Sequence, residues 1–293
     1  MRVRTVMREY AALLGRSLRR LRTRYNVPPD PSETWIRADA VRIFWFIQTY
    51  RDLPKLRQTL SRLRTLYPET PVLVVSDGDP NPQIKQACDL HSVEFRLRPR
   101  LYGVEHGGAL VQQFLEAFLS TGADILIKID PDTDVRRRLS LMPMPADASI
   151  YGTVQSAGSK RGPSIQGGCI IVPRRAAILV AGSALLMSER LKPPALEWAV
   201  DEATRARATA GLTSSDQTLG WACRELGLQC KDHPEVCSRY RPSLMDTITA
   251  SRVAVFHPRF QVRHLVDPAF YFSGLRAVVA EALRNRNVAA PTD

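Results

Sequence analysis

Hydrophobic and polar residues follow two different patterns along this chain. In residues 1–25, apolar positions recur three and four apart, which is typical of a helix with one apolar face. From residue 41 onward, short apolar runs alternate with segments of helical period. A strand followed repeatedly by a helix predicts right-handed crossovers and a mainly parallel sheet covered on both faces. We therefore expect an α/β fold preceded by an N-terminal amphipathic helix.

The expected elements of the main domain can be placed by residue range. Strands are expected at 41–48, 71–76, 92–97 and 124–129, and helices at 52–66 and 108–120, with a short helix after residue 80. The prolines at 28, 29 and 31 break the chain before these elements. We therefore divide the chain into a basic helical arm and proline-rich linker at 1–38, a main domain at 39–285 and a tail at 286–293.

Three polar segments follow predicted strands, namely Thr49–Arg51, Asp77–Asp79 and Asp130–Asp134. Because ligands of parallel sheets bind outside the carboxyl ends of the strands, these segments are expected to share one rim. None of these turns carries the glycine fingerprint of a dinucleotide-binding or P-loop site. If a diphosphate binds at this rim, we expect a metal ion to neutralise it.

The third segment places carboxylates at alternate positions, Asp130, Asp132 and Asp134. Alternate side chains of an extended chain point the same way, so the acids would crowd at one strand end. Mg²⁺ and Mn²⁺ bind such oxygen ligands, usually together with substrate phosphates. The alternative is an acidic turn that closes the strand, with Pro131 and Thr133 as turn residues.

The charge is strongly basic and concentrated in the arm. The chain has 293 residues, 44% of them hydrophobic, so it can bury a sizeable core. Of the formal charge of +12, residues 1–24 carry eight arginines against Glu9, a local net of +7. Residues 1–25 are suited to an anionic membrane surface, or to packing on the main domain or in a dimer. Nucleic acid is a weaker interpretation, because no zinc finger, recognition helix or ribonucleoprotein motif accompanies the charge.

Cysteine usage and hydropathy favour a cytoplasmic protein, peripheral at the inner face of the membrane if the arm binds lipid. The five cysteines are unevenly spaced, which favours reduced thiols over disulfides. No secretory segment or apolar stretch near 18 residues is present. A zinc site would need Cys223, Cys230, His233 and Cys237, but their spacings lack a CxxC knuckle, so free thiols are expected.

Two segments carry a resemblance to a known family. Residues 46–60 read FIQTYRDLPKLRQTL and residues 74–79 read VVSDGD. They are similar to the ends of the first and second strands in GT-A nucleotide-sugar glycosyltransferases of the family 2 type. Gln48 replaces a usual proline, and Ser76 replaces the first acid of the second signature. The resemblance implies that three residues hold the nucleotide base and ribose: Thr49, Tyr50 and Asp77.

The same resemblance assigns a metal and diphosphate site. Asp130 and Asp132 would be the DxD motif that binds Mn²⁺ or Mg²⁺ with the donor diphosphate. Lys128 is expected on the face of the acids, where it could pair with a carboxylate; the alternative is a lysine that extends to solvent from a strand end. Gly167 and Gly168 look like the glycine pair that lines the donor-sugar and acceptor pocket, where the backbone approaches a ligand closely. The alternative is a plain turn into a strand.

Two further residues complete the implied site. Residues 214–227 resemble the helix start that supplies the catalytic base of inverting members, which would be Asp216, with Ser215 in place of a frequent glutamate. The alternative is a capping box formed by Ser214 and Gln217. His257 would be the third metal ligand that many GT-A enzymes take from a C-terminal histidine, although a histidine at a strand end is as often structural.

The resemblance covers about residues 41–260 and implies a GT-A, Rossmann-like fold. It implies a metal-dependent transferase that moves a sugar from a nucleotide-diphosphate donor to a hydroxyl of a carbohydrate or lipid-linked acceptor. The implied reaction inverts the anomeric centre, with Asp216 as the general base. Two alternatives stay open: a retaining family 8-like enzyme, because Asp216-Gln217 also resembles its Asp-Gln element, and a non-catalytic GT-A-like scaffold that binds polyanions. Two groups of residues have open alternatives. One group would help to bind the diphosphate or would form a basic edge strand: Arg96, Arg98 and Arg100. The other would stack on a sugar or pack in the core: Trp198 and Trp221.

Overall fold

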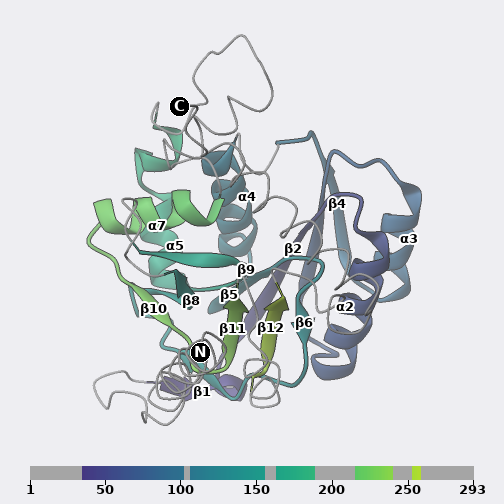
Figure 1. The fold of residues 1–293 in the computed structure, drawn as a ribbon, viewed down its shortest axis with the longest axis horizontal. Coiled ribbons are helices and arrows are strands. Elements are labelled where there is room, and N and C mark those ends of the chain that lie inside the picture. Colours follow the sequence, from purple (N-terminus) through teal and green to yellow (C-terminus); the bar gives the residue numbers. More distant parts are fainter. Residues whose placement is uncertain (1–34, 102–105, 156–162, 189–214, 240–252, 259–293) are drawn as a thin grey trace, which may run out of the picture.

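A seven-stranded sheet forms the centre of the computed structural model, which describes residues 35–101, 106–155, 163–188, 215–239 and 253–258. The strand order is β10-β8-β9-β5-β2-β3-β4 (Figure 1). These strands are β2 (Ile43–Thr49), β3 (Val72–Asp77), β4 (Glu94–Arg98), β5 (Ile125–Ile129), β8 (Ile150–Gln155), β9 (Ser164–Pro173) and β10 (Cys230–Asp232). β5, β2, β3 and β4 are parallel neighbours, and β9 is antiparallel to both β5 and β8. The predicted α/β fold with a mainly parallel sheet is confirmed.

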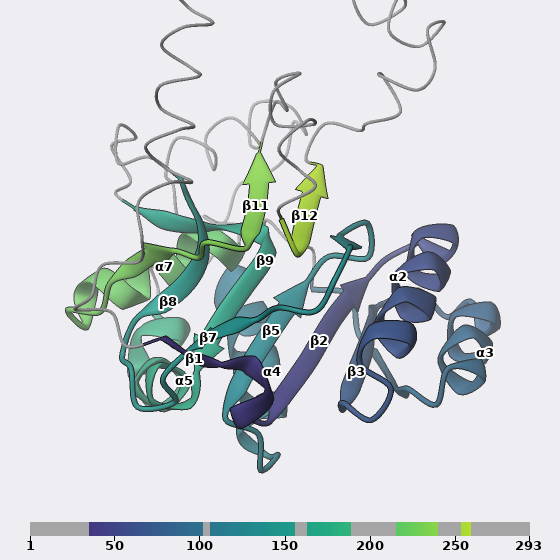
Figure 2. The same ribbon diagram turned by 90° about the horizontal axis from the view of Figure 1, so that it is seen from below.

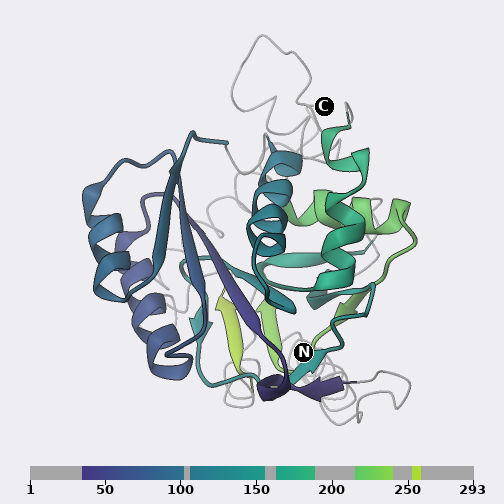
Figure 3. The same ribbon diagram turned by 180° about the vertical axis from the view of Figure 1, so that it is seen from behind.

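Helices cover both faces of this sheet (Figures 1 and 3). The helices are α2 (Leu53–Leu66) and α3 (Pro82–Leu90) on one face, and α4 (Gly107–Leu119), α5 (Arg174–Ala181) and α7 (Ser215–Glu225) on the other. Successive side chains of β2 point to opposite faces of the sheet, so this strand packs against both helical layers. Trp45 packs on the face covered by α2, and Phe46 contacts Phe114 of α4 on the other face. Full burial of each such side chain stabilises the fold by about 1.5–3 kcal/mol.

Local sequence signals explain where the helices begin. Pro54 lies in the first turn of α2, where a missing backbone N–H costs no helical hydrogen bond. Asn81 caps α3, because its side-chain oxygen accepts a hydrogen bond from the backbone N–H of Gln83 at 3.0 Å. The expected strands and helices between residues 41 and 129 all occur, with ends shifted by one or two residues.

Two small sheets attach to the main one. β1 (Trp35–Arg37) pairs antiparallel with β7 (Leu141–Pro143), although the sequence suggested a linker at this segment. Two short 3-10 helices, η1 (Ala38–Ala40) and η2 (Ala184–Met187), are also present. A three-stranded sheet joins β11 (Val236–Arg239), β12 (Val255–Pro258) and β6 (Asp134–Val135). Figure 2 places β11 and β12 next to β9, and both strands contact it. This sheet brings the last described strand to the carboxyl end of β5.

Several sequence predictions concern residues outside the described ranges. They include the amphipathic helix of residues 1–25, the tail at 286–293 and Trp198. Among the described residues, no helix combines the length and the apolar character that crossing a bilayer requires.

Candidate metal and donor site

A tight turn follows β5 and carries the first two acids of the acidic segment. The Thr133 backbone N–H donates to the carbonyl of Asp130 at 3.1 Å, which closes the turn. The Thr133 hydroxyl donates to the carbonyl of Gly168 at 2.7 Å, and the Thr59 hydroxyl of α2 donates to the carbonyl of Pro131 at 2.7 Å. The turn is therefore held between β9 and α2 by Thr133, which the sequence suggested as a turn residue, and by Thr59, which no sequence motif indicated.

The turn separates the three acids that were expected to share one face. Asp134 belongs to β6, and its carboxylate pairs with Arg136 at 2.7 Å. Asp130 and Asp132 instead gather with His257 of β12, and their ligand atoms all lie within 4.8 Å of one another. His257 Nε2 is 3.1 Å from Asp132 Oδ1 and 3.6 Å from Asp130 Oδ2. The expectation of a continuously extended acidic strand is wrong because the chain bends at Pro131.

The three side chains have the chemistry and spacing that a small divalent cation needs. In an octahedral site with bonds of about 2.1 Å, adjacent ligand atoms lie about 3 Å apart and opposite ones about 4.2 Å. The observed separations of 3.1 and 3.6 Å fall in this range. Two carboxylates and an imidazole suit Mn²⁺, and Mg²⁺ also accepts the carboxylate oxygens. The residues present therefore fit such an ion, and their role as ligands stays a prediction.

Carboxylate charge accumulates at this edge of the sheet. Burial would raise the pKa of Asp132, but the hydrogen bond and charge of His257, helped by the charge of Lys55, hold this pKa below its usual value. The pKa of nearby Asp52 is raised by burial and by the negative charges of Asp132 and Asp130. A bound cation would relieve this repulsion.

Lys128 provides a buried positive charge beside the carboxylate of Asp130. Its side chain is only 6% exposed, and its ammonium donates to Asp130 Oδ1. The same ammonium donates to the carbonyl of Gly167 at 2.8 Å. The alternative of a lysine extending to solvent is therefore wrong, and Lys128 orients Asp130 toward β9.

The glycine pair of β9 lies between two of the predicted site residues. A Cβ on Gly168 would lie 2.1 Å from Cγ of His257, so only glycine fits here. A Cβ on Gly167 would lie 3.8 Å from the Cβ of Asp216, an ordinary contact. The close approach expected at the pair is thus made by a side chain of the protein itself.

Asp216 lies in the first turn of α7 and is 5% exposed. Its Oδ2 accepts a hydrogen bond from the side-chain amide of Gln155 at 3.2 Å, and its Oδ1 accepts one from the backbone N–H of Gln217 at 2.9 Å. Gln155, at the end of β8, was not predicted as a site residue, and no sequence signal points to it. The alternative capping box includes Ser214, which lies outside the described residues.

The first two polar segments lie at the same edge of the sheet as the acidic turn, as expected, because β2 pairs in parallel with both β3 and β5. The backbone N–H of Arg51 donates to Asp79 Oδ2 at 3.2 Å, which joins the ends of β2 and β3. Asp52, next in the chain, lies within the electrostatic reach of the acidic turn. The three segments therefore share one rim of the sheet, at the carboxyl ends of β2, β3 and β5.

The residues assigned to the nucleotide lie at the ends of β2 and β3. Thr49 is buried, and its hydroxyl has no hydrogen-bond partner among the described residues. The guanidinium of Arg100 covers the ring of Tyr50, with Cζ 3.2 Å from the ring centre. Asp77 Oδ1 accepts a hydrogen bond from the backbone N–H of Leu101 at 2.6 Å. Arg100 therefore takes part in this rim, whereas Arg96 pairs with Glu94 in the edge strand β4.

Two further possibilities from the sequence were a zinc site at the cysteines and sugar stacking on Trp221. None of the five cysteines forms a disulfide, and Cys223, Cys230, His233 and Cys237 do not gather as a metal cluster in the described part of the chain. Trp221 is 6% exposed and packs in the core.

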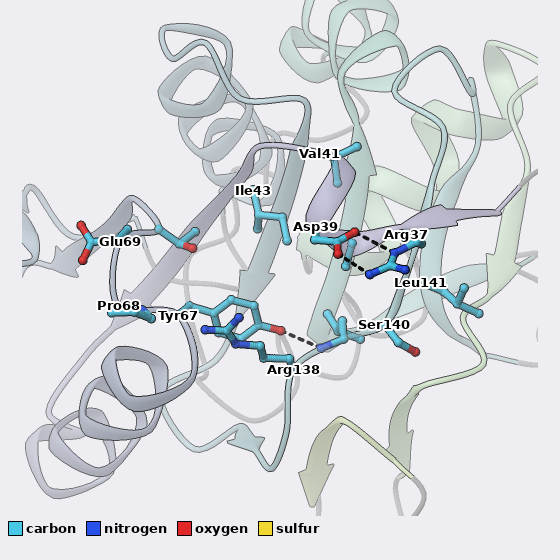
Figure 4. A pocket seen from close by; sticks show the side chains of 13 residues that line it. Arg37, Asp39, Val41, Ile43, Tyr67, Pro68, Glu69, Arg138, Ser140 and Leu141 are labelled. Carbon is cyan, nitrogen blue, oxygen red and sulfur yellow. Dashed lines mark hydrogen bonds and ion pairs between the residues drawn. The ribbon is translucent and has the colours of Figure 1, made fainter.

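A separate hollow of about 650 Å³ lies near the start of β2 (Figure 4). Its rim includes the ion pair between Arg37 and Asp39 at 2.6 Å, and its wall includes Tyr67, whose hydroxyl oxygen accepts from the Leu139 N–H at 2.7 Å. Ile43, the first residue of β2, also lines it, so the hollow lies at the amino edge of the parallel strands. Because ligands of such sheets bind at the carboxyl edge, the group around Asp132 is the better candidate for a functional site.

Comparisons with known proteins add little to this geometry. No protein-family model matches the chain, and no curated protein matches it. Among solved structures, it is similar to the mannosyltransferase PcManGT from Pyrobaculum calidifontis in complex with GDP-Man and Mn²⁺. The match has 16% identity and a TM-score of 0.36, and it covers 58% of this chain and 54% of that one. The chain thus matches about half the length of that enzyme, and a likeness this weak carries no argument.

Proposed function

We propose that this protein is a metal-dependent glycosyltransferase that moves a sugar from a nucleotide-diphosphate donor to an acceptor hydroxyl. The observation that supports this proposal is the gathering of Asp130, Asp132 and His257 at the carboxyl edge of the sheet. Ligands of α/β sheets bind at this edge. The acceptor in this proposal is a carbohydrate or a lipid-linked sugar.

The two carboxylates and the imidazole would hold Mn²⁺ or Mg²⁺. Such an ion acts as a Lewis acid and stabilises charge on a leaving diphosphate. Lys128 fixes the carboxylate of Asp130 by donating to it, and the hydroxyl of Thr133 fixes the turn against β9. The chain therefore holds the two carboxylates in place before any ligand arrives, which lowers the cost of binding.

The nucleotide would lie over the ends of β2 and β3. In this proposal Thr49, Tyr50 and Asp77 bind the base and ribose. The ring of Tyr50 presents an aromatic face at the same rim, now covered by Arg100. Gly167 and Gly168 would line the path from the diphosphate to the acceptor.

Asp216 would act as the general base and take the proton from the acceptor hydroxyl. A positioned general base contributes about 10²–10⁴-fold to a rate. Gln155 holds one oxygen of this carboxylate, so it would act as a positioning residue. Direct attack by the acceptor inverts the anomeric centre, and the configuration of the product separates this mechanism from a retaining one.

Thermal unfolding with UDP, GDP and their sugar conjugates, with and without Mn²⁺, tests the proposal. A nucleotide at 100 times its dissociation constant adds about 2.7 kcal/mol to the free energy of unfolding, a shift of several degrees. Asp132→Asn should abolish the metal-dependent shift. Asp89→Asn is the control, because Asp89 is exposed, pairs with Lys85 in α3 and is not part of the metal group.

Two results would count against the proposal. One is a nucleotide shift that is the same in the wild type and in Asp132→Asn. The other is no shift with any nucleotide, accompanied by tight and salt-dependent binding of a polyanion, which would favour a non-catalytic scaffold.

A further inference from the structure

A second hollow, of about 180 Å³, lies on the α2 side of the acidic turn. The polar and aromatic residues that line it include Lys55, Gln58, Arg62, Asp132, Arg136 and Phe256. The lining residues come from α2, from the acidic turn with β6, and from β12. Figure 1 shows β6 between α2 and β12. The hollow is smaller than the 300–1,000 Å³ of a typical ligand pocket, so it suits one chemical group rather than a whole ligand.

One wall is a row of donors along α2. Lys55, Gln58 and Arg62 are three and four residues apart, so they lie on the same side of the helix. Thr59 on the neighbouring side binds the carbonyls of Pro131 and Thr133, at 2.7 and 3.2 Å. These two hydrogen bonds fix the row of donors against the acidic turn.

The opposite wall carries a third cation. The guanidinium of Arg136 lies over the ring of Phe256, with Cζ 4.6 Å from the ring centre, and pairs with Asp134 at 2.7 Å. Asp134 therefore offsets Arg136, and Asp132 belongs to the metal group. Three cations and two carboxylates line the hollow, which leaves one positive charge in excess, so the hollow favours an anion.

We propose that the hollow between α2 and β6 binds a phosphoryl group beside the metal. Lysine binds phosphate as a point charge and arginine binds it through paired N–H donors, and both types line the hollow. Asp132 on its rim repels an anion unless a cation neutralises it, so a divalent ion should strengthen phosphate binding. This part of the inference rests on the proposed metal site. The phosphoryl group belongs either to the donor diphosphate or to a phosphorylated acceptor.

Calorimetric titration of the full chain with methyl phosphate, at fixed ionic strength with and without Mg²⁺, tests the inference. The double variant Lys55→Gln/Arg62→Gln removes two charged donors from the lining, so it should bind methyl phosphate at least about ten-fold more weakly. Arg57→Gln removes an exposed charge from the same helix outside the hollow and is the matched control. We expect it to retain wild-type affinity and Mg²⁺ to tighten binding in the wild type.

Equal losses in the double variant and in Arg57→Gln would overturn the inference, and so would a wild type that binds no methyl phosphate with Mg²⁺. Competition with a saturating nucleoside diphosphate identifies the source of the phosphoryl group. Displacement of methyl phosphate assigns it to the donor, and simultaneous binding assigns it to the acceptor. A chain that binds methyl phosphate in this hollow but binds no nucleotide would contradict only the proposed transferase function.

Discussion

The imidazole of His257 packs against the backbone of Gly168 so closely that the hydrogen on this glycine cannot be replaced by carbon. A Cβ there would lie 2.1 Å from Cγ and 2.3 Å from Nδ1 of the ring. His257 is in turn the group that faces Asp130 and Asp132. The absence of a side chain at Gly168 therefore allows the imidazole of His257 to lie next to the two carboxylates.

Gly168→Ala should displace His257 and weaken Mn²⁺ binding by at least about ten-fold. Overpacking of this kind also costs about 1–3 kcal/mol of stability. Gly167→Ala is the matched control, because a Cβ there would lie 3.8 Å from its nearest neighbour, the Cβ of Asp216. Titration with Mn²⁺ and chemical denaturation measure both effects. Equal metal affinity in the two variants would show that His257 is not a ligand.

Lys128→Met should lower the stability of the metal-free protein by about 2 kcal/mol, because Asp130 loses its buried counter-charge beside Asp132. Mn²⁺ supplies positive charge to the same carboxylates, so the metal should stabilise this variant more than it stabilises the wild type. Denaturation with Mn²⁺ and with a chelator measures the difference.

The control for this variant is Lys85→Met, which removes the exposed pair with Asp89 at 2.7 Å. Exposed helical pairs contribute about 0.3–0.5 kcal/mol, and no dependence on Mn²⁺ is expected. A loss in Lys128→Met that stays the same with and without Mn²⁺ would contradict the prediction.

Stability should fall as the pH drops from about 6.5 toward 4, because burial lowers the pKa of His233 from 6.5 to about 4. The unfolded chain binds more protons than the folded chain in this range, so the free energy of unfolding decreases as the pH decreases. The shift corresponds to up to about 3 kcal/mol. His233 Nδ1 accepts the Glu235 N–H at 3.2 Å, a hydrogen bond that protonation breaks.

Denaturation between pH 4 and 7 checks this dependence, and His233→Gln should flatten it over that range. The pKa of Glu235 is also below its usual value: its hydrogen bonds to Ser140, Arg137 and the Leu141 N–H outweigh the effect of burial. Its contribution is lost at lower pH, so it should remain in the variant. A wild-type curve that is level from pH 7 to 4 would be inconsistent with a neutral buried His233.

Asp216→Asn should leave metal-dependent nucleotide binding unchanged and reduce sugar transfer by about 10²–10⁴-fold, because an amide cannot accept the acceptor proton. Donor affinity and initial rates are measured on the same preparation. If the variant transfers sugar at the wild-type rate, another group must be the base.

The acids and the strand before them could be predicted from sequence because they are local. The apolar run and the two acids after it, Asp130 and Asp132, together span fewer than ten residues of sequence (124–132). The turn at Pro131 was weighed only as an alternative, because its hydrogen bonds come from Thr59 and Gly168, 72 and 35 residues away in the chain. The contact between Gly168 and His257 was also beyond local patterns.

The antiparallel direction of β9 is a second feature that the strand pattern did not predict. An apolar run such as residues 164–173 reads alike in either direction, so periodicity cannot assign its orientation. The connection from Gln155 to Ser164 is shorter than the dozen or more residues that a parallel crossover needs. Loop length was therefore the available signal, and it points to the antiparallel pairing with β8.

His257 and Asp132 are 125 residues apart in the sequence. A ribosome makes the chain from its N-terminus, so the acidic turn emerges long before β12 is synthesised. Contacts of such separation are also slow to form, because a long loop must close first. During synthesis the two carboxylates are therefore present before the imidazole, and a product terminated between residues 133 and 256 would retain both acids but lack His257, the proposed third ligand.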